Sequence, residues 1–429
     1  MFKFFLISQK LILFLTIIIL SKSLSLKSES IKLEFRQKNN FFTVPIIIGS
    51  KGEQFEVQID TTTSLTWIPS INTTYSVNKF NPKNSATCSI TNLTFEIDDE
   101  DGNVKGLSLY DSISVGSYLL DKFGFVLADS FQQNFKDFNQ GKLGLGFHHE
   151  HGVDFNFIGS LKKNRLIEKE IFSISPNDKE LIIGDIPEKY KGEKYTKCNL
   201  TETNDLDNVY RAGWVCEMTH IYFGVDTENK TLEMALPVDA RVIFDSAYKY
   251  IFMPKRHLEK FNKNFMEEFY HDSCIQIKEN EEIYFICDAD EKIEKGAMAF
   301  VIGGYGYVIP WYKLFKKILD DKFEMLIRFH KENDDIFTFG YPFVSQFVVV
   351  YNSEDKELGF YGGEKINVTK DWDKYMIGES PSQKKEKMKK MLIYLAIFSG
   401  ILLFIIICLV IRANTKANLE KRSMIQNEV

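Results

Sequence analysis

The sequence has little cysteine, no large excess of either charge and few long apolar runs. Its 6 cysteines in 429 residues are too few for a fold built on disulfides. Its 53 Lys and Arg against 59 Asp and Glu give a formal net charge of −6, which argues against nucleic acid as a partner. A hydrophobic content of 44% with a mean hydropathy of −0.18 excludes a polytopic membrane protein. The fold is therefore expected to depend on apolar cores, in two or three domains at about 150 residues each.

Two apolar runs are present, one near each end of the chain. Residues 1–25 start with lysines, run through Leu11–Leu20 and reach small residues, which predicts a signal peptide cleaved near Ser25; a retained anchoring helix is the alternative. Residues 391–411 carry no charge and are long enough to cross a hydrocarbon core of about 30 Å, which predicts a transmembrane helix. The lysines of residues 384–390 lie on the side of this helix that would face away from the cytosol, contrary to the usual excess of positive charge on the cytosolic side. We therefore infer the orientation of the helix from the signal peptide.

This orientation predicts a single-pass type I membrane protein. Its ectodomain would lie in the lumen of the secretory or endolysosomal pathway or outside the cell, and residues 412–429 would form a cytosolic tail. Five Asn-x-Ser/Thr sequons fall in the predicted ectodomain and indicate glycosylation sites there. They are Asn72, Asn92, Asn199, Asn229 and Asn367.

The predicted ectodomain is patterned mostly as strands. Between residues 41 and 366, short apolar, β-branched or aromatic runs are bounded by Gly, Asn, Asp or Pro. Helical periodicity appears only in short stretches, such as residues 156–167 and 254–270.

Two segments of this body resemble each other, FEVQIDTTTSLTWIPS around Asp60 and ARVIFDSAYKYIFMP around Asp245. In each, an apolar strand runs into an aspartate and then into small or hydroxyl residues. Each segment is followed much later by an apolar pair and a glycine, in GKLGLGF (residues 141–147) and FTFGYPF (residues 337–343). The repeat predicts a duplicated lobe.

At these residues the chain resembles the pepsin-like family of aspartic proteases, in which each lobe contributes one aspartate from a DTG or DSG motif. Further blocks are similar to the family's, namely KFNPKNSAT (79–87), DFNFIGSLKKNRLIEKEIFSIS (154–175) and AGWVCEMTHIYFG (212–224). The resemblance covers residues 41–361. It implies a mostly β, bilobal pepsin-like acid protease fold with pseudo-two-fold symmetry, followed by the transmembrane helix.

The resulting domain organisation follows the chain in order. We expect a signal peptide (1–25), a short N-terminal segment (26–40), an N-terminal lobe (41–210), a C-terminal lobe (211–366), a juxtamembrane linker (367–390), the transmembrane helix (391–411) and the tail (412–429). The segment IKLEFRQK within residues 26–40 resembles a fragment of the family's inhibitory propeptide but is shorter than a whole one.

The resemblance implies that Asp60 and Asp245 form a catalytic pair. Peptide hydrolysis without a covalent intermediate needs a base to activate water and an acid to protonate the carbonyl oxygen. Two facing carboxylates that share one proton can do both, which implies an acidic working pH. By position, Thr61 and Ser246 would hydrogen-bond across the pseudo-two-fold axis and Thr63 would contact the outer oxygen of Asp60. Trp67 matches a tryptophan behind the flap, a position that is also core packing.

Several residues depart from the family pattern. Thr62 and Ala247 replace the two motif glycines, so a β-carbon is expected to push on the pair. Tyr248 and Lys249 replace small hydroxyl residues. In the flap, Asp99 stands where the family carries tyrosine, within an acidic tip made of Asp99, Glu100, Asp101 and Gly102. This tip either overhangs the peptide site and favours basic ligands, or is a solvated turn.

The cysteines outside the transmembrane run are expected to form two pairs. Cys274 and Cys287 bracket a segment that is disulfide-closed in similar proteins, and Cys198 with Cys216 is a plausible second pair. Cys88 is then left over, as a buried free thiol.

Two functions remain open at this point. The first is a membrane-anchored, monomeric aspartic endopeptidase that binds an extended peptide between its lobes. The second is a catalytically impaired ectodomain that binds peptides or mediates adhesion. No cofactor is implied, and no metal, because the histidines of HHEH (His148, His149, His151) lack a fourth ligand at a telling spacing.

Overall fold

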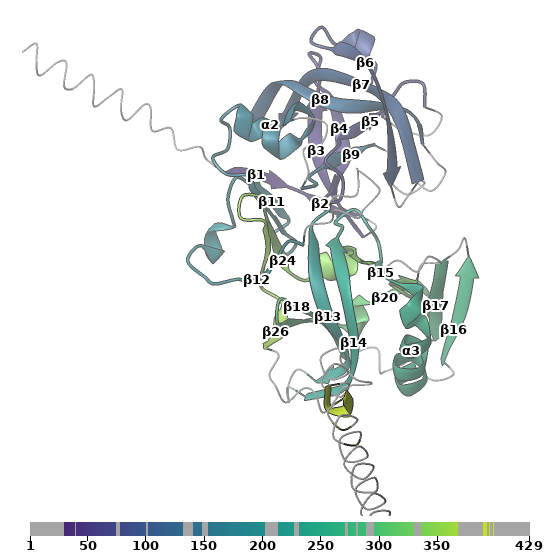
Figure 1. Cartoon of the computed structure of the whole chain (residues 1–429). Coiled ribbons are helices and arrows are strands. Elements are labelled where there is room, and N and C mark those ends of the chain that lie inside the picture. Colours follow the sequence, from purple (N-terminus) through teal and green to yellow (C-terminus); the bar gives the residue numbers. More distant parts are fainter. Residues whose placement is uncertain are drawn as a thin grey trace, which may run out of the picture. The chain divides into compact units, whose positions relative to one another are not determined.

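The structure is a computed structural model, and two compact units divide the chain at residues 375 and 376. The described residues are 30–38, 40–73, 78–99, 102–131, 140–147, 153–201, 213–226, 231–270, 273–279, 282–288, 296–329, 336–367, 389–392, 394 and 398. The predicted signal peptide therefore lies outside them. Both lobes belong to the first unit and consist mainly of strands (Figure 1).

The first lobe is an eight-stranded sheet that folds back on itself. Its order is β2 (Arg36–Lys38), β3 (Phe41–Ile48), β4 (Glu53–Asp60), β9 (Lys142–Gly144), β5 (Trp67–Pro69), β8 (Tyr118–Phe131), β7 (Gly102–Val115) and β6 (Ser89–Asp99). A second pairing joins β3 to β7 and closes part of the sheet. Apolar side chains such as Val44, Ile46 and Val57 fill its interior with no exposed surface, as expected for strands whose burial drives folding.

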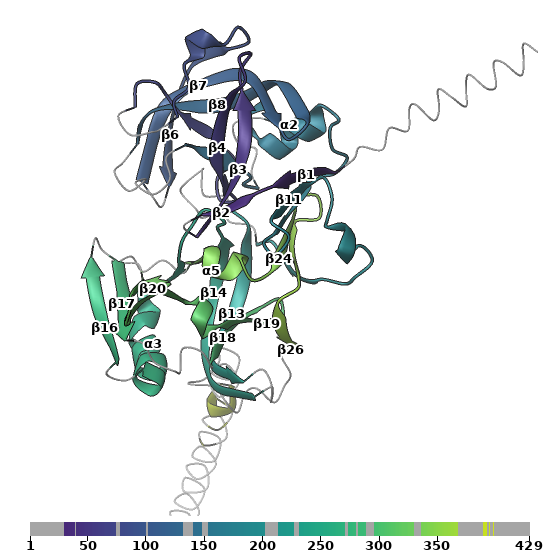
Figure 2. The ribbon, with the colours of Figure 1, turned by 180° about the vertical axis from the view of Figure 1, so that it is seen from behind.

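A six-stranded sheet connects the lobes, and both halves of the chain contribute to it. Its order is β1 (Ile31–Glu34), β11 (Glu180–Ile183), β10 (Ile171–Ser175), β24 (Val348–Asn352), β25 (Glu357–Tyr361) and β12 (Thr196–Asn199). In the view from behind, β1, β11 and β24 lie where the two lobes meet (Figure 2). The segment that resembles a propeptide fragment thus begins with an edge strand of this sheet, in which buried Ile31 and Leu33 alternate with exposed Lys32 and Glu34.

The second lobe is built on a twelve-stranded sheet. Its order is β20 (Phe315–Leu319), β21 (Lys322–Met325), β17 (Glu282–Asp288), β22 (Ile327–Phe329), β15 (Ile251–Met253), β23 (Ile336–Phe339), β14 (Thr231–Phe244), β13 (Val215–Asp226), β18 (Ala297–Ile302), β19 (Tyr305–Pro310) and β26 (Glu364–Asn367), with β16 (Cys274–Glu279) paired to β17. The mostly β, two-lobed arrangement predicted from the sequence is therefore present.

The described helices are short. They include α2 (Phe157–Lys163), α3 (Leu258–Phe261), α5 (Tyr341–Val344) and a π-helical stretch, Asn262–Tyr270. Helix α2 begins where the sequence supplies a cap, because the Asn156 side chain accepts a hydrogen bond of 2.7 Å from the backbone N–H of Gly159. It ends before Arg165, whose φ of 59° cannot continue a right-handed helix.

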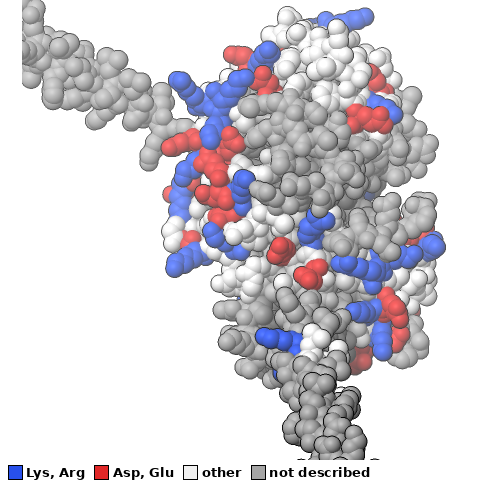
Figure 3. All heavy atoms as spheres, in the orientation of Figure 1, with Lys and Arg blue, Asp and Glu red and all other residues white. Residues whose placement is uncertain are grey.

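Charged side chains of both signs gather at the left edge of the face seen in Figure 3, over α2, β1 and β11. Ion pairs formed by side chains of this part of the chain include Lys163–Asp154 and Lys189–Asp178, both at 2.6 Å. Exposed pairs of this kind contribute little to stability, typically about 0.2–1 kcal/mol each.

One such contact ties α2 to the turn after β24. Glu354 accepts hydrogen bonds from Lys162 at 2.6 Å and from the backbone N–H of Glu170 at 3.1 Å. The bond from Lys162 holds the pKa of Glu354 below its ordinary value. A lowered folded-state pKa means that the ionised Glu354 stabilises the fold above its ordinary pKa and loses that effect as the pH falls.

Glu354→Gln is therefore expected to lower the free energy of unfolding at neutral pH by about 0.2–1 kcal/mol, with a difference that shrinks on acidification. Chemical denaturation of both proteins at neutral pH and near pH 3 measures this, with the exposed Glu168→Gln as the matched control. A loss that grows in acid would contradict the assignment.

The second unit, residues 376–429, is described at only a few positions. Among the described residues of the whole chain, no helix is long and apolar enough to cross a membrane. Most of residues 391–411 lie outside the described part, so the transmembrane helix stays a prediction.

Candidate active site

The two repeated aspartates occupy equivalent places in the two lobes. Asp60 ends β4, and Asp245 directly follows β14. Strand β4 pairs in parallel with β9, which places Asp60 beside Gly144, and β14 pairs in parallel with β23. The Asp60 carbonyl accepts a bond of 2.7 Å from Leu145, and the Asp245 N–H donates one of 3.0 Å to Phe339. Each aspartate is thus fixed by the apolar and glycine motif of its own lobe.

Glycines in those motifs allow the close approach. A β-carbon on Gly144 would lie 2.7 Å from the carbonyl group of Leu65, and one on Gly146 would lie 2.6 Å from Thr63. In the second lobe, a β-carbon on Gly340 would lie 2.3 Å from the carbonyl oxygen of Tyr250. Real β-carbons do not come this near, so the two turns that follow the aspartates require these glycines.

Hydroxyl groups next to the aspartates cross from one lobe to the other. The Thr61 hydroxyl donates to the carbonyl of Phe244 at 2.8 Å and accepts from the N–H of Ser246 at 3.0 Å. The Ser246 hydroxyl donates to the carbonyl of Ile59 at 2.7 Å. Thr61 and Ser246 are both completely buried. This reciprocal network, predicted for these two residues, holds the two turns against each other.

The carboxylate of Asp60 collects several donors. Its Oδ1 accepts from the backbone N–H of Thr62 at 2.8 Å, from the Thr62 hydroxyl at 2.8 Å and from the N–H of Thr63 at 3.1 Å. The Thr63 hydroxyl, expected at the outer oxygen, accepts instead from the N–H of Leu65 at 3.1 Å. The outer oxygen Oδ2 faces Lys142, whose Nζ lies 3.2 Å away.

Asp245 has a matching but simpler set of described bonds. Its Oδ1 accepts from the N–H of Ala247 at 2.8 Å, and its Oδ2 lies 3.4 Å from the Thr62 hydroxyl. Thr62 therefore stands between the two carboxylates. Thr62, which replaces the motif glycine, thus places a hydroxyl within hydrogen-bond distance of both carboxylates, while the crowding expected from its β-carbon stays a prediction.

The other departures from the motif lie around the second aspartate. The Ala247 carbonyl accepts a bond of 2.6 Å from the buried side chain of Gln58, which is a further link between the lobes. Tyr248 packs against Phe252 with ring centroids 4.9 Å apart, and the Lys249 Nζ lies 4.9 Å from the centre of the Phe41 ring.

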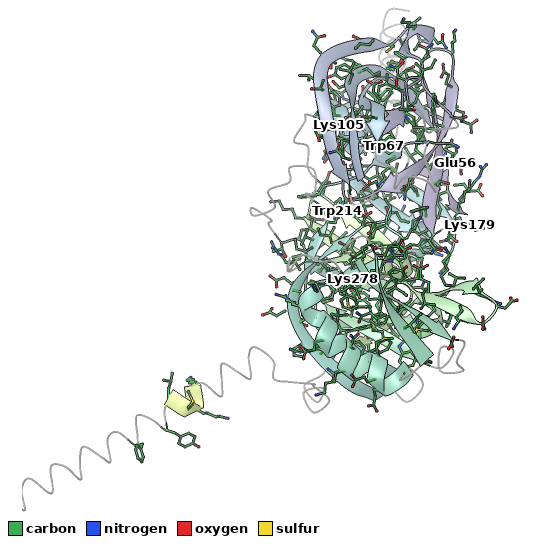
Figure 4. The ribbon with its side chains drawn as sticks, turned by 90° about the vertical axis from the view of Figure 1, so that its right-hand side faces the viewer. Glu56, Trp67, Lys105, Lys179, Trp214 and Lys278 are labelled. Atoms are coloured by element: carbon green, nitrogen blue, oxygen red, sulfur yellow. A yellow bond between two sulfur atoms is a disulfide. The ribbon has the colours of Figure 1, made fainter. Side chains whose placement is uncertain are left out.

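The flap hairpin is formed by β6 and β7, with Asp99 opposite Gly102 at its end. Phe95, Ile97 and Val104 of this hairpin pack against Trp67, which is buried in the first lobe (Figure 4). Glu100 and Asp101 lie outside the described residues, as does the side chain of Asp99. The two alternatives for the acidic tip therefore both stay open.

Large aromatic side chains contact the backbone that holds the aspartate pair. The Trp214 Nε1 donates to the carbonyl of Leu145 at 3.2 Å, and Trp214 lies between the two lobes in Figure 4. Its ring contacts Tyr351 edge-on, with centroids 5.1 Å apart. Burial raises the pKa of Tyr351, and the charge of Asp245 acts in the same direction, so the Tyr351 phenol stays neutral.

The predicted disulfides Cys198–Cys216 and Cys274–Cys287 are both present. Cys88 is free and only partly buried, and burial together with the nearby Asp111 raises its pKa to about 11.

Among the sequons, Asn72, Asn92 and Asn199 are exposed, whereas Asn229, the side chain of Asn367 and the three histidines of HHEH lie outside the described residues. Glycosylation stays a prediction.

Lys142 is the site residue that the sequence analysis missed. The residue belongs to GKLGLGF, where it was included in the apolar pattern. Its signal was a charged residue directly before the apolar and glycine motif, at a position that the parallel pairing of β4 and β9 brings beside Asp60.

Two lobes that each contribute an aspartate to one hydroxyl-braced pair define the bilobal acid protease class. The chain belongs to the eukaryotic aspartyl protease family, whose model matches residues 41–361.

Individual relatives are distant. Pepsin-3 of Oryctolagus cuniculus is 21% identical over 330 residues, which cover 73% of this chain and 78% of that protein. Gastricsin of Cavia porcellus is 27% identical over 168 residues, covering 35% and 42%. Pregnancy-associated glycoprotein 1 of Sus scrofa is 24% identical over 248 residues, covering 53% and 59%. The matches to the last two span less than two thirds of those proteins.

Proposed function

We propose that this protein is a membrane-anchored aspartic endopeptidase that cleaves peptides bound in extended form between its lobes. The observation that carries the proposal is the reciprocal hydrogen-bond network of the Thr61 and Ser246 hydroxyls. This network holds Asp60 and Asp245 on opposite sides of the Thr62 hydroxyl. Family membership supports peptidase chemistry in general.

In the proposed reaction, Asp60 takes a proton from water as the water oxygen attacks the peptide carbonyl carbon. Asp245 gives its proton to the carbonyl oxygen, which yields a tetrahedral diol. As the C–N bond breaks, the amine takes the proton held by Asp60, and one hydroxyl of the diol returns its proton to Asp245 as the new carboxyl group forms. No covalent enzyme intermediate forms and the pair regains its starting protonation. One of the two groups must be protonated, so we expect activity on the acidic side of neutrality, as in an endolysosomal or secretory lumen.

A second function is favoured by one specific observation. Asp60 is 1% exposed and is paired with a buried lysine, so the group proposed as the base is already engaged. A pair held in this way suits an ectodomain that binds peptides without cutting them.

The two functions are separated by incubating the purified full chain with a mixed peptide library at several values between about pH 3 and 7. New termini at defined bonds, found by mass spectrometry and strongest in acid, are the expected result. Peptides that are retained on the immobilised protein but stay intact would favour the binding function and reject the endopeptidase.

A further inference from the structure

A lysine side chain is buried beside the catalytic pair. Lys142 lies on β9, opposite Gln58 of β4 and two residues before Gly144, which faces Asp60. Its Nζ is 3.2 Å from Oδ2 of Asp60, and the two side chains are 2% and 1% exposed. Lysine is almost never buried to this extent unless it is paired with an opposite charge. The contact with Asp60 supplies such a pair.

The equivalent place in the second lobe holds no such cation. Strand β23 pairs with β14 as β9 pairs with β4, and Thr338 lies opposite Ile243, two residues before Gly340. Thr338 is thus the counterpart of Lys142. The pseudo-symmetric site is therefore asymmetric in charge, with an ammonium group on the Asp60 side and an uncharged hydroxyl residue on the Asp245 side.

The ammonium group occupies the oxygen that a reacting water needs. A carboxylate offers about four lone-pair positions. Three described donors, from Thr62 and Thr63, already use Oδ1 of Asp60, and Lys142 faces Oδ2. A water molecule that is to give its proton to Asp60 must compete with Lys142 for Oδ2. The position of Lys142 therefore opposes the first step of hydrolysis, because its ammonium group must leave Oδ2 before a water molecule can bind there.

We propose that Lys142 is an internal inhibitory cation of the aspartate pair, which restrains hydrolysis by holding the outer oxygen of Asp60. The proposal rests on the proposed endopeptidase function. It assigns the inhibition to a residue of the first lobe, through the contact between Lys142 and Asp60, which a single substitution removes.

The test compares the full chain with Lys142→Met and Lys142→Gln on one peptide that the wild type cleaves, or on the library if it cleaves none. Methionine keeps an unbranched side chain without the charge, and glutamine keeps a hydrogen-bond donor without the charge. We expect kcat/KM to rise at least about tenfold in Lys142→Met, because methionine leaves Oδ2 of Asp60 open to water, and to rise less in Lys142→Gln, because the glutamine amide can still donate to that oxygen. Lys163→Met removes an exposed lysine from an ion pair of the same lobe and should leave the rate unchanged.

Thermal denaturation at the assay pH shows which variants are folded, and Lys142→Gln replaces Lys142→Met if the latter is not. A folded variant with the wild-type rate or a lower one overturns the inhibitory role, while cleavage by the wild type leaves the endopeptidase proposal intact. Absence of cleavage by the wild type and by every folded variant overturns both. A rise in rate that also occurs in Lys163→Met overturns the assignment to this contact.

Discussion

Asp60→Asn and Asp245→Asn are each expected to lower kcat/KM at least about a thousandfold, because an amide can neither take a proton from water nor donate one as a carboxylic acid does. The two variants should differ in stability. Asp60→Asn leaves the buried ammonium group of Lys142 facing a neutral amide, and removal of one partner of a buried ion pair costs roughly 3–5 kcal/mol. In Asp245→Asn, the amide oxygen can still accept from the N–H of Ala247, and the amide NH2 can donate to the Thr62 hydroxyl, whose own proton goes to Asp60.

Peptide cleavage in acid and thermal denaturation together check this expectation. The double variant Asp60→Asn, Lys142→Met serves as the control, because removing both charges should restore most of the stability and none of the activity. Retention of the wild-type rate in either single variant would refute the catalytic pair. Equal stability of the two single variants would refute the buried ion pair.

Thr61→Val is the second change with a large expected effect. Valine has the shape of threonine, so it leaves no cavity, but it removes the hydroxyl that serves two buried backbone groups, the carbonyl of Phe244 and the N–H of Ser246. Each buried group left without a partner costs about 1–3 kcal/mol, which gives a loss of roughly 2–6 kcal/mol in the free energy of unfolding. Small displacements of the pair should also lower kcat, by about a hundredfold for a shift near 1 Å.

Chemical denaturation and steady-state kinetics measure these two losses. Ser246→Ala removes one described bond, to the carbonyl of Ile59, so its loss should be about half as large. Thr61→Ser keeps the hydroxyl and should recover most of both quantities. A Thr61→Val protein as stable as the wild type would show that the network does not hold the lobes together.

Much of the fold was predictable because strands and turns leave strong local patterns. The runs FFTVPIIIG (41–49), EIYFICD (282–288) and SQFVVVYN (345–352) contain β3, β17 and β24, and GLSLYDSISVG (106–116) covers β7 from Gly106 onward. The helical prediction for residues 254–270 was only approximate, because a short 3-10 turn, α3 and a π-helical stretch share that segment. Apolar spacing alone does not distinguish hydrogen bonds that span four residues from those that span five.

The site residues that belong to the repeated segments around Asp60 and Asp245 could be predicted from the sequence. Those brought to the site by the pairing of distant strands could not. Asp60, Asp245, Thr61 and Ser246 follow from two matching motifs, each of which is local in sequence. Lys142 does not, because its role depends on the parallel pairing of β9 with β4. The same reasoning explains Gln58, whose bond to the Ala247 carbonyl joins residues that no local pattern connects.

The bridge between Cys198 and Cys216 spans the stretch of chain where the predicted lobes meet. A single backbone cut between these cysteines would leave both fragments covalently attached. The fragments would also share one sheet, since β1, β10, β11 and β12 precede the cut and β24 and β25 follow it. Separation of the halves therefore requires a reducing agent and a denaturant as well as a protease.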